Sequence, residues 1–272
     1  MVKTYHFMAG LPRSGSTVLS ALLNQHLNIY SSPSSNLVSM LHKLDQQIPN
    51  YESYKAGLFH DGYKNVMNGM ADNFYSHIDK PLIIDKNRSW GVPYSWNNLS
   101  GYVNPKGKVI ITMRPILEVL ASFVKVIEKS EEITGNAAYY NEGFWAAHYR
   151  DKRDAQVDYI MRLNGEMDKS IFSVVNLLKN HRESVHVVWF NDLMENPQDT
   201  LNKIYDFLEV NRCKNNFNSI KKVDKQDDLK GYGILGLHEI NNKLKNPETE
   251  PQKYLTEYVI AKYGNALDFL NI

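Results

Sequence analysis

Short apolar runs alternate with helical patterns along this chain of 272 residues. Four runs have the length and composition of buried strands, namely 5–9, 81–86, 108–114 and 185–190. Apolar residues at the spacing of an amphipathic helix follow the first, third and fourth runs, within 15–25, 116–127 and 201–208. This alternation predicts an α/β fold, a three-layer domain in which helices flank a central parallel sheet.

The remaining segments are less regular. Residues 31–36 are polar and predict a loop, which ends in capping residues before a further helix. The apolar positions of that helix are Leu37, Met40, Leu41 and Leu44. With 43% hydrophobic and 22% charged residues the composition is that of a globular protein, and the length suits one large domain. We therefore expect a single domain over 1–272.

The first predicted strand leads into a loop bounded by Gly10 and Gly15. Residues 10–17 read G-x-x-x-x-G-S-T, which is the phosphate-binding P-loop pattern with Ser16 in place of its lysine. The backbone amides of such a loop, with the positive end of the next helix, can hold a 5′-phosphate whatever the side chains are. The missing lysine normally reaches the β- and γ-phosphates of a nucleoside triphosphate. The loop therefore favours a nucleotide with one 5′-phosphate, and Arg13 supplies a cation.

Charged side chains follow the second and third predicted strands. Asp85, Lys86 and Arg88 lie at or just after the end of one strand, and Arg114 ends the other. In an open parallel sheet ligands bind beyond the carboxyl ends of the strands, so we expect these residues to face the same crevice as the loop. A phosphate bound without a metal favours a guanidinium and a hydroxyl donor, which Arg114 and Ser122 offer.

Three blocks of the sequence resemble the sulfotransferases that use 3′-phosphoadenosine 5′-phosphosulfate (PAPS). The string G-x-P-R-S-G-S-T at 10–17 closely resembles the 5′-phosphosulfate loop of that family. Arg114-Pro115, Glu118-Val119 and Ser122 are similar to its 3′-phosphate segment. The stretch 190–208 resembles a third, weaker pattern, with Phe-Asn-Asp where the family has Tyr-Glu-Asp. The resemblance implies a P-loop-like fold and in-line transfer of a sulfuryl group from PAPS to a hydroxyl or amine, with no metal required.

The resemblance also implies roles for individual residues. Arg13 is expected at the 5′-phosphosulfate, and Lys86 at the sulfuryl group or the bridging oxygen, so these two are the candidate catalytic residues. Ser16 and Thr17 are expected at the 5′-phosphate. The complete set of expected nucleotide-binding residues is Pro12, Arg13, Ser14, Gly15, Ser16, Thr17, Arg114 and Ser122.

The general base stays open. Several sulfotransferases have a catalytic glutamate where this chain has only Ser34-Ser35-Asn36, and cytosolic relatives have a histidine where it has Arg88. Asp85, His42 and His60 are the remaining candidates. A reaction without a strong base is a further alternative, because an acidic acceptor such as a phenol needs only a weak one.

Two other parts of the chain are expected to shape the site. Segments 31–78 and 130–182 are expected to form a helical and loop cover over the acceptor, and their aromatic residues suit a small molecule, a glycan, a lipid or a peptide. A late basic loop is expected to close over the nucleotide. It lies either at Lys230-Gly231 or within 237–245.

Composition argues against some classes of function, and two alternatives to a sulfotransferase remain. The net charge of +1 and the lack of a basic patch argue against nucleic acid as a partner. No apolar run approaches the roughly 18 residues of a membrane span, and with a single cysteine, Cys213, we expect a cytoplasmic protein. One alternative is a small-molecule kinase that uses ATP and magnesium, with Asp85 as metal ligand but without the P-loop lysine. The other is a nucleotide-binding module without catalysis.

Overall fold

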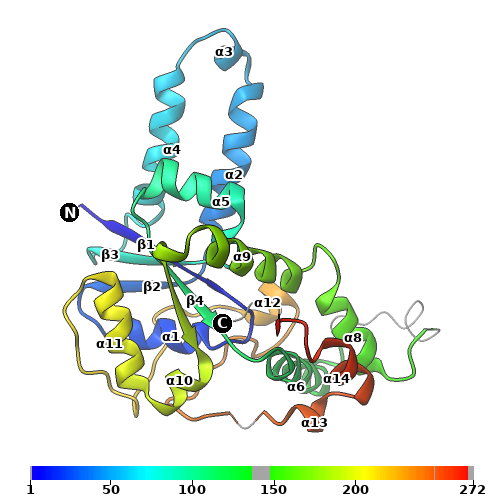
Figure 1. Ribbon diagram of the computed structural model, residues 1–272. Helices are drawn as coiled ribbons and strands as arrows, with labels where there is room; N and C mark the ends of the chain where they lie inside the picture. The colour runs from blue at the N-terminus through cyan, green and yellow to red at the C-terminus, as the bar shows by residue number, and fades with distance from the viewer. Residues whose placement is uncertain (1, 137–147, 248, 269–272) are drawn as a thin grey trace.

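The computed structural model describes residues 2–136, 148–247 and 249–268 (Figure 1). Five strands form one parallel sheet in the order β2-β3-β1-β4-β5. The strands are β1 (Thr4–Gly10), β2 (Ile29–Ser34), β3 (Leu82–Lys86), β4 (Val109–Met113) and β5 (Val185–Trp189). Four of them are the strands predicted from the apolar runs. The prediction of an α/β fold with a central parallel sheet is confirmed.

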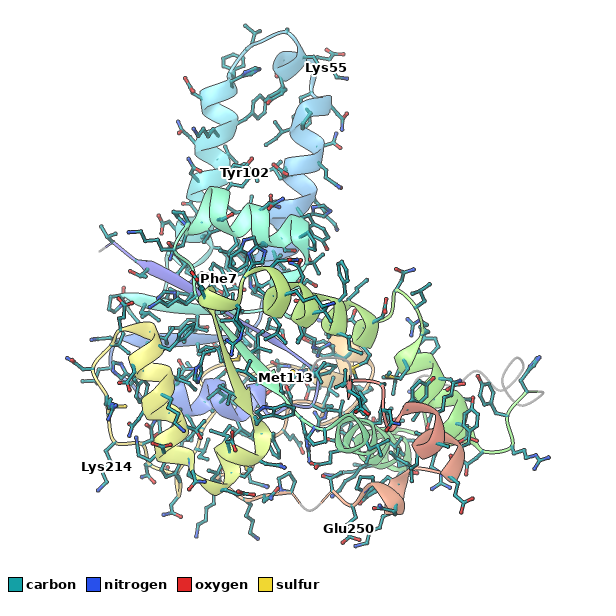
Figure 2. The ribbon with its side chains drawn as sticks, viewed as in Figure 1. Phe7, Lys55, Tyr102, Met113, Lys214 and Glu250 are labelled. Atoms are coloured by element: carbon teal, nitrogen blue, oxygen red, sulfur yellow. The ribbon has the colours of Figure 1, made fainter. Side chains whose placement is uncertain are left out.

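Helices cover both faces of the sheet, which gives three layers. Neighbouring side chains on a strand point to opposite faces, so Phe7 and Met8 of β1 belong to two separate cores. The Met8 face is covered by α1 (Ser16–Leu23), α10 (Phe190–Glu195) and α11 (Pro197–Leu208). The Phe7 face is covered chiefly by α2 (Leu37–Gln47), α4 (His60–Phe74), α6 (Ile116–Thr134) and α9 (Glu166–Asn180). Figure 2 labels Phe7 and Met113, which both belong to this second, larger core.

The edge strand β2 corrects the prediction of a loop over 31–36. The strand continues through Ser34, because the serine hydroxyls find partners inside the protein. The Oγ of Ser31 lies 3.0 Å from the Oγ of Ser20, and the Oγ of Ser32 accepts a hydrogen bond of 3.0 Å from the backbone N–H of Lys86. A polar strand of this kind has no apolar periodicity from which it could be predicted.

A helical hairpin projects from the body of the protein (Figure 1). Its arms are α2 and α4, and the short helices η1 (Ile48–Asn50) and α3 (Glu52–Lys55) connect them. Lys55 lies near its tip (Figure 2). Beside the body, α5 (Pro93–Asn98) and the π-helical turn η3 (Leu99–Val103) support the arms, and the hydroxyl of Tyr102 donates to Asp45 of α2 at 2.9 Å.

The remaining short elements are η2 (Arg88–Gly91), α8 (Lys152–Met161), η4 (Arg182–Ser184), α12 (Asp228–Tyr232), α13 (Pro251–Tyr254) and α14 (Glu257–Tyr263). Of the segment 130–182, for which a cover over the acceptor is predicted, residues 137–147 lie outside the described residues. In the described parts of the chain, none of the helices is long and apolar enough to cross a membrane.

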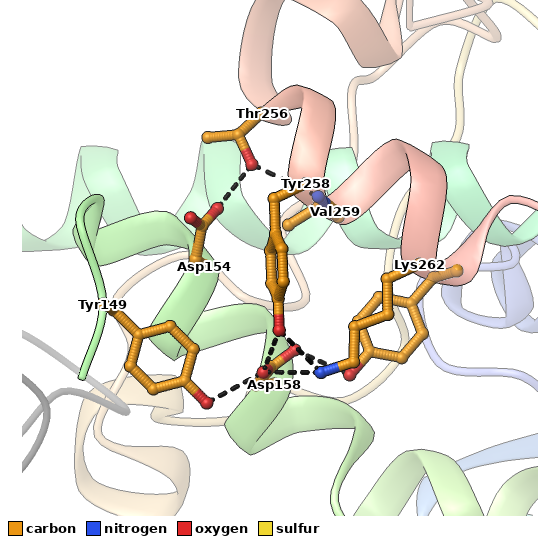
Figure 3. A network of polar contacts seen from close by, with 8 residues as sticks. Tyr149, Asp154, Asp158, Thr256, Tyr258, Val259 and Lys262 are labelled. Carbon is orange, nitrogen blue, oxygen red and sulfur yellow. Dashed lines mark hydrogen bonds and ion pairs between the residues drawn. The ribbon is translucent and has the colours of Figure 1, made fainter.

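One carboxylate fastens the C-terminal helices to α8 (Figure 3). Asp158 accepts hydrogen bonds of 2.7–2.9 Å from the phenols of Tyr149, Tyr258 and Tyr263 and from the ammonium of Lys262. Burial alone would raise the pKa of Asp158, but these donors outweigh burial and lower it. The chain before α14 is thereby held against the body of the protein, and this chain includes part of the site described next.

Candidate functional site

A cavity of about 290 Å³ lies beyond the carboxyl ends of the central strands. Its floor is the loop 11–15 with the first turn of α1, together with the ends of β3 and β4. Its walls are the first half of α6 and the start of α10, and residues 235–247 with Thr249 cover it. We call residues 235–249, apart from the undescribed residue 248, the cover segment.

Two glycines give the floor loop its shape. Gly10 has φ = 126°, and a Cβ atom there would lie 2.3 Å from the carbonyl oxygen of Thr112. Gly15 has φ = 86°, and a Cβ atom there would lie 2.5 Å from the ring of Phe190. Both positions therefore require glycine, because other residues rarely adopt such φ values and no space exists for a side chain.

The backbone of the floor loop is arranged to bind an anion. In the described structure, the backbone N–H groups of residues 13–18 have no intramolecular acceptor, and no side chain caps α1. The hydroxyls of Ser16 and Thr17 line the same cavity and are also without a described protein partner. Six amide donors at a helix N-terminus form a cradle for phosphate oxygens.

Pro12 and Ser14 contribute to this cradle in a different way. Pro12 lines the cavity but has no N–H group. The side chain of Ser14 is only 2% exposed and points into the protein, where its Oγ lies 2.7 Å from the Oγ1 of Thr112 and 2.5 Å from the carbonyl oxygen of Leu11. The hydroxyl of Ser14 therefore fixes the loop to β4 and is not available to a ligand. Only the backbone amide of Ser14 can contact a ligand.

Arg13 joins three parts of the site. Its Nε donates to the Oγ of Ser122 on α6 at 3.1 Å, and its Nη1 donates to the carbonyl oxygen of Leu237 in the cover segment. Burial, together with the neighbouring charges of Arg114 and Arg88, lowers the pKa of Arg13 to about 10. A buried cation beside other cations indicates a site that awaits negative charge.

Arg114 is held by the protein on every side. It is 3% exposed, and its Nε donates to Glu118 at 3.0 Å, its Nη2 to Thr249 at 3.1 Å and its Nη1 to the carbonyl oxygen of Arg13 at 3.3 Å. The guanidinium carbon lies 4.4 Å from the centre of the Phe190 ring. Burial lowers the pKa of Arg114, and Glu118 opposes that shift. The predicted phosphate ligands Arg13, Arg114 and Ser122 thus lie together on one wall.

Lys86 presents a cation without a counter-ion. It ends β3, is 6% exposed and lines the cavity, yet its ammonium has no ion-pair or hydrogen-bond partner among the described residues. Burial lowers its pKa to about 8, with additional repulsion from Arg88 and Lys222. Arg88 also lines the cavity and forms an ion pair with the exposed Glu166 at 3.2 Å.

None of the three base candidates lines the cavity. Asp85 is completely buried on the opposite side of β3 from Lys86, where it accepts hydrogen bonds from Ser35, Tyr75 and Trp90. Because strand side chains alternate, the residue next to Lys86 cannot face the same side.

The two histidine candidates belong to the hairpin and its support. His42 stacks on Tyr94 of α5 with ring centres 3.8 Å apart. His60 stacks on Tyr54 and bonds to its carbonyl oxygen at 2.9 Å. The structure therefore does not bring Asp85, His42 or His60 to this cavity.

The structure distinguishes between the two candidate lids. Lys230 and Gly231 belong to α12 and do not line the cavity, whereas the cover segment does, with Lys243 and Lys245 among its lining residues. Two backbone hydrogen bonds attach the cover segment to residues 217–220. The N–H of Ile220 donates to the carbonyl oxygen of Asn242, and the N–H of Leu244 donates to that of Phe217.

The cover segment also contains His238, which lies in the stretch 237–245 that the sequence predicts only as a basic lid. His238 is a lining residue of the cavity, and its Nδ1 lies 2.7 Å from Oδ1 of the buried Asp228. No local pattern marks this pair, because the two residues meet only after 228–238 has folded back on itself.

The parallel sheet, the amide cradle and the cationic wall define a nucleotide-binding protein with a P-loop-like fold. The family model of the sulfotransferase domain matches residues 3–269, and the chain belongs to this family. The family implies transferase activity of the sulfotransferase type and does not favour the kinase alternative. No curated protein matches the sequence significantly.

Solved structures share the fold. A sulfotransferase domain from the curacin biosynthetic pathway is 16% identical with a TM-score of 0.58, and the alignment covers 100% of this chain and 98% of that one. The sulfotransferase STF9 from Mycobacterium avium is 14% identical with a TM-score of 0.53, over 100% of this chain and 78% of that one. At these identities the likeness supports the fold alone, so the roles of individual residues must be argued from the site.

Proposed function

We propose that the cavity binds PAPS and that the protein transfers its sulfuryl group to a hydroxyl or amine of an acceptor. The observation that carries this proposal is the pairing of six free amides in the loop with an unpaired ammonium, that of Lys86, in the same cavity. The amides suit the 5′-phosphate, and we assign the lysine, which lines the same cavity, to the group attached to that phosphate.

The reaction forms one bond and breaks one. A lone pair of the acceptor oxygen or nitrogen attacks sulfur, while the bond between sulfur and the bridging oxygen of the 5′-phosphate breaks. The leaving group is 3′,5′-bisphosphoadenosine (PAP), and the acceptor loses a proton. Negative charge grows on the bridging oxygen, so donors placed there in advance lower the barrier. We assign Lys86 and Arg13 to that charge, and the backbone of 13–18 with Ser16 and Thr17 to the 5′-phosphate.

The 3′-phosphate is assigned to the wall formed by Arg114 and Ser122. Both side chains have protein partners, Glu118 and Thr249 for Arg114 and Arg13 for Ser122. A phosphate with two negative charges can replace Thr249, a neutral acceptor, on the guanidinium. The acceptor remains a hydroxyl or amine compound, whether a small molecule, a glycan, a lipid or a peptide.

Calorimetric titration of the purified protein with PAP, AMP, and ATP with magnesium tests the proposal. PAP is expected to bind most tightly, because only PAP carries the 3′-phosphate. Arg114→Ala should weaken PAP binding about 10- to 100-fold, the loss of about 1.5–3 kcal/mol in charge-assisted hydrogen bonds. Its control is Lys230→Ala, which alters a cation outside the cavity.

Two results would contradict the assignment: a preference for ATP with magnesium, or equal PAP affinity in Arg114→Ala and the wild type. Circular dichroism shows whether Arg114→Ala is folded, and Arg114→Lys keeps the charge if it is not. Transfer of label from radioactive PAPS to a panel of phenols, sugars, amines and peptides then identifies the acceptor class.

A further inference from the structure

His238 and Asp228 form a buried pair at the edge of the cavity. In addition to the contact between Nδ1 and Oδ1, the backbone N–H of His238 donates to Oδ2 of Asp228 at 2.7 Å. The Nε2 of Gln226 lies 2.9 Å from Oδ1 of Asp228 and 2.6 Å from Nδ1 of His238. The ring of Tyr232 lies beside the imidazole, with centres 4.9 Å apart. The imidazole is therefore fixed in position and orientation.

This geometry determines which nitrogen of His238 carries the proton. Hydrogen bonding outweighs burial and lowers the pKa of Asp228, so its carboxyl is ionised near neutral pH. An ionised oxygen 2.7 Å from Nδ1 favours a proton between the two atoms, and the amide of Gln226 donates to the same oxygen. The 2.6 Å approach of the Gln226 amide nitrogen to Nδ1 is then a contact between two donors and not a hydrogen bond. In the neutral imidazole Nδ1 is then the donor, and the lone pair is on Nε2. Nε2 has no hydrogen-bond partner in the described structure, and it is not completely enclosed by protein atoms.

The charges that face His238 keep it neutral. Burial lowers its pKa to about 4, Asp228 opposes this shift, and Lys86 and Arg88 reinforce it. A histidine in this state is unprotonated at neutral pH, so one ring nitrogen has a lone pair that can receive a proton from an acceptor. A donor that brings several negative charges next to Lys86 and Arg88 offsets their repulsion, and so raises the pKa of His238 towards the range that suits a general base.

We propose that His238 is the general base of the transfer and that Asp228 is its positioning residue, an assignment that rests on the proposed function. The acceptor proton moves to Nε2 as the acceptor attacks sulfur and the bond to the bridging oxygen breaks. The imidazolium, stabilised by Asp228, gives the proton to solvent after the products leave. Histidine thus acts from the cover segment, while the strand-end position where cytosolic relatives have their histidine is Arg88.

The base is linked to the donor loop through one contact. Arg13, assigned to the phosphosulfate, donates to the carbonyl oxygen of Leu237, the residue before His238. The cover segment must be in place for this contact to form. This contact therefore joins the donor loop to the residue next to the proposed base.

The test uses His238→Gln and His238→Ala, with His60→Gln on the distant hairpin as a matched control. The reaction is measured with an acceptor from the panel and with PAPS alone, where water is the acceptor and PAP release is followed by chromatography. Both His238 variants should lose about 10²- to 10⁴-fold in kcat and keep PAP affinity within about threefold. Imidazole in the buffer should restore part of the activity of His238→Ala, and His60→Gln should equal the wild type.

Nuclear magnetic resonance of the labelled imidazole gives a readout that does not require turnover. We expect the Nδ1–H tautomer in the wild type, its loss in Asp228→Asn, and an upward shift of the His238 pKa when PAP binds. An Nε2–H tautomer in the wild type, or full activity in His238→Gln, would overturn the assignment of the base. If the wild type neither binds PAP nor releases it from PAPS, the proposed function itself fails, which is a distinguishable result.

Discussion

The floor and the cover of the cavity differ in how the sequence encodes them. The floor is built from short segments that are each recognisable in the sequence, since 10–17 form the loop and Lys86 directly ends a strand. The cover has little regular structure, and its contacts join residues far apart, such as Arg13 and Leu237 at a separation of 224 positions. The proposed phosphate binding therefore depends mainly on a short motif, whereas the proposed proton transfer depends on the completed fold.

The largest effect is expected from the floor. Lys86→Met keeps the length of the side chain but removes the charge assigned to the bridging oxygen. The value of kcat should fall about 10²- to 10³-fold, as when one preorganised donor is removed from a transition state. PAP affinity should change less than about tenfold. Initial rates with labelled PAPS and calorimetry with PAP measure the two quantities.

Lys230→Met is the matched control for that experiment, because it removes a lysine of the rejected lid. If Lys86→Met lowered PAP affinity and left kcat intact, Lys86 would be a binding residue only. The proposal that the floor supplies the catalytic cation and the cover supplies the base would then be contradicted.

A smaller effect is expected from Gly15→Ala. The new Cβ atom would lie 2.5 Å from the Phe190 ring, and the left-handed backbone adds about 1–2 kcal/mol of strain. The loop should shift, and PAP affinity should fall about tenfold or more. Gly57→Ala separates the two causes, because Gly57 also has a positive φ of 78° but no atom within 4 Å of the added Cβ.

Both glycine variants should therefore lose some stability in urea denaturation, and only Gly15→Ala should lose PAP affinity. Equal PAP binding by Gly15→Ala and the wild type would show that the shape of the floor loop is not what binds the nucleotide.

The smallest effect on the site is expected from Asp158→Asn, which weakens the attachment of α14 and so acts on the cover from a distance. The free energy of unfolding at pH 7 should fall by about 1–3 kcal/mol, because hydrogen bonds to a charged group are lost. PAP affinity should fall only a few-fold. Urea denaturation and calorimetry measure the two effects.

The pH dependence of stability follows from the lowered pKa of Asp158. A carboxyl group with a depressed pKa stabilises the fold above its unfolded pKa, and the contribution disappears as the pH falls through the folded value. The difference between wild type and Asp158→Asn should therefore shrink below pH 3.8, the ordinary carboxyl value. Asp206→Asn, which breaks an exposed ion pair with Arg212, is the control and should have less effect. If the difference in the free energy of unfolding persisted in acid, the charge of Asp158 would not be what attaches α14.

The sequence predicted the parts of the fold that depend on local patterns. Apolar runs identified four strands, and helical periodicity identified α1, α2, α6 and α11. The strand β2 could not be predicted in this way, because Ser31 and Ser32 are buried by hydrogen bonding and not by apolar character. Within the loop, the pattern could not show that the Ser14 hydroxyl points inward, since its partner Thr112 is 98 positions away.

The candidate site shows the same difference between features set by local sequence patterns and features set by contacts between distant residues. The residues of the floor and the Arg114 wall were predicted and lie together, although their contacts with a nucleotide remain a proposal. The proposed base was not predicted, because its assignment rests on the contact between His238 and the carboxylate of Asp228, which forms only in the folded chain. Asp228 and His238 lie on either side of a turn whose path no periodicity indicates.

The bond between Arg13 and Leu237 also has a consequence for synthesis of the chain. At about 5–20 residues per second, a ribosome needs between roughly 11 and 45 s to add the 224 residues that separate these partners. During that time the residues assigned to the phosphates, from the floor loop to Arg114, are synthesised, but the cover does not yet exist. The nascent chain therefore holds the proposed phosphate ligands before it holds the proposed base, and the order of translation delays the proposed sulfuryl transfer until the cover has left the ribosome.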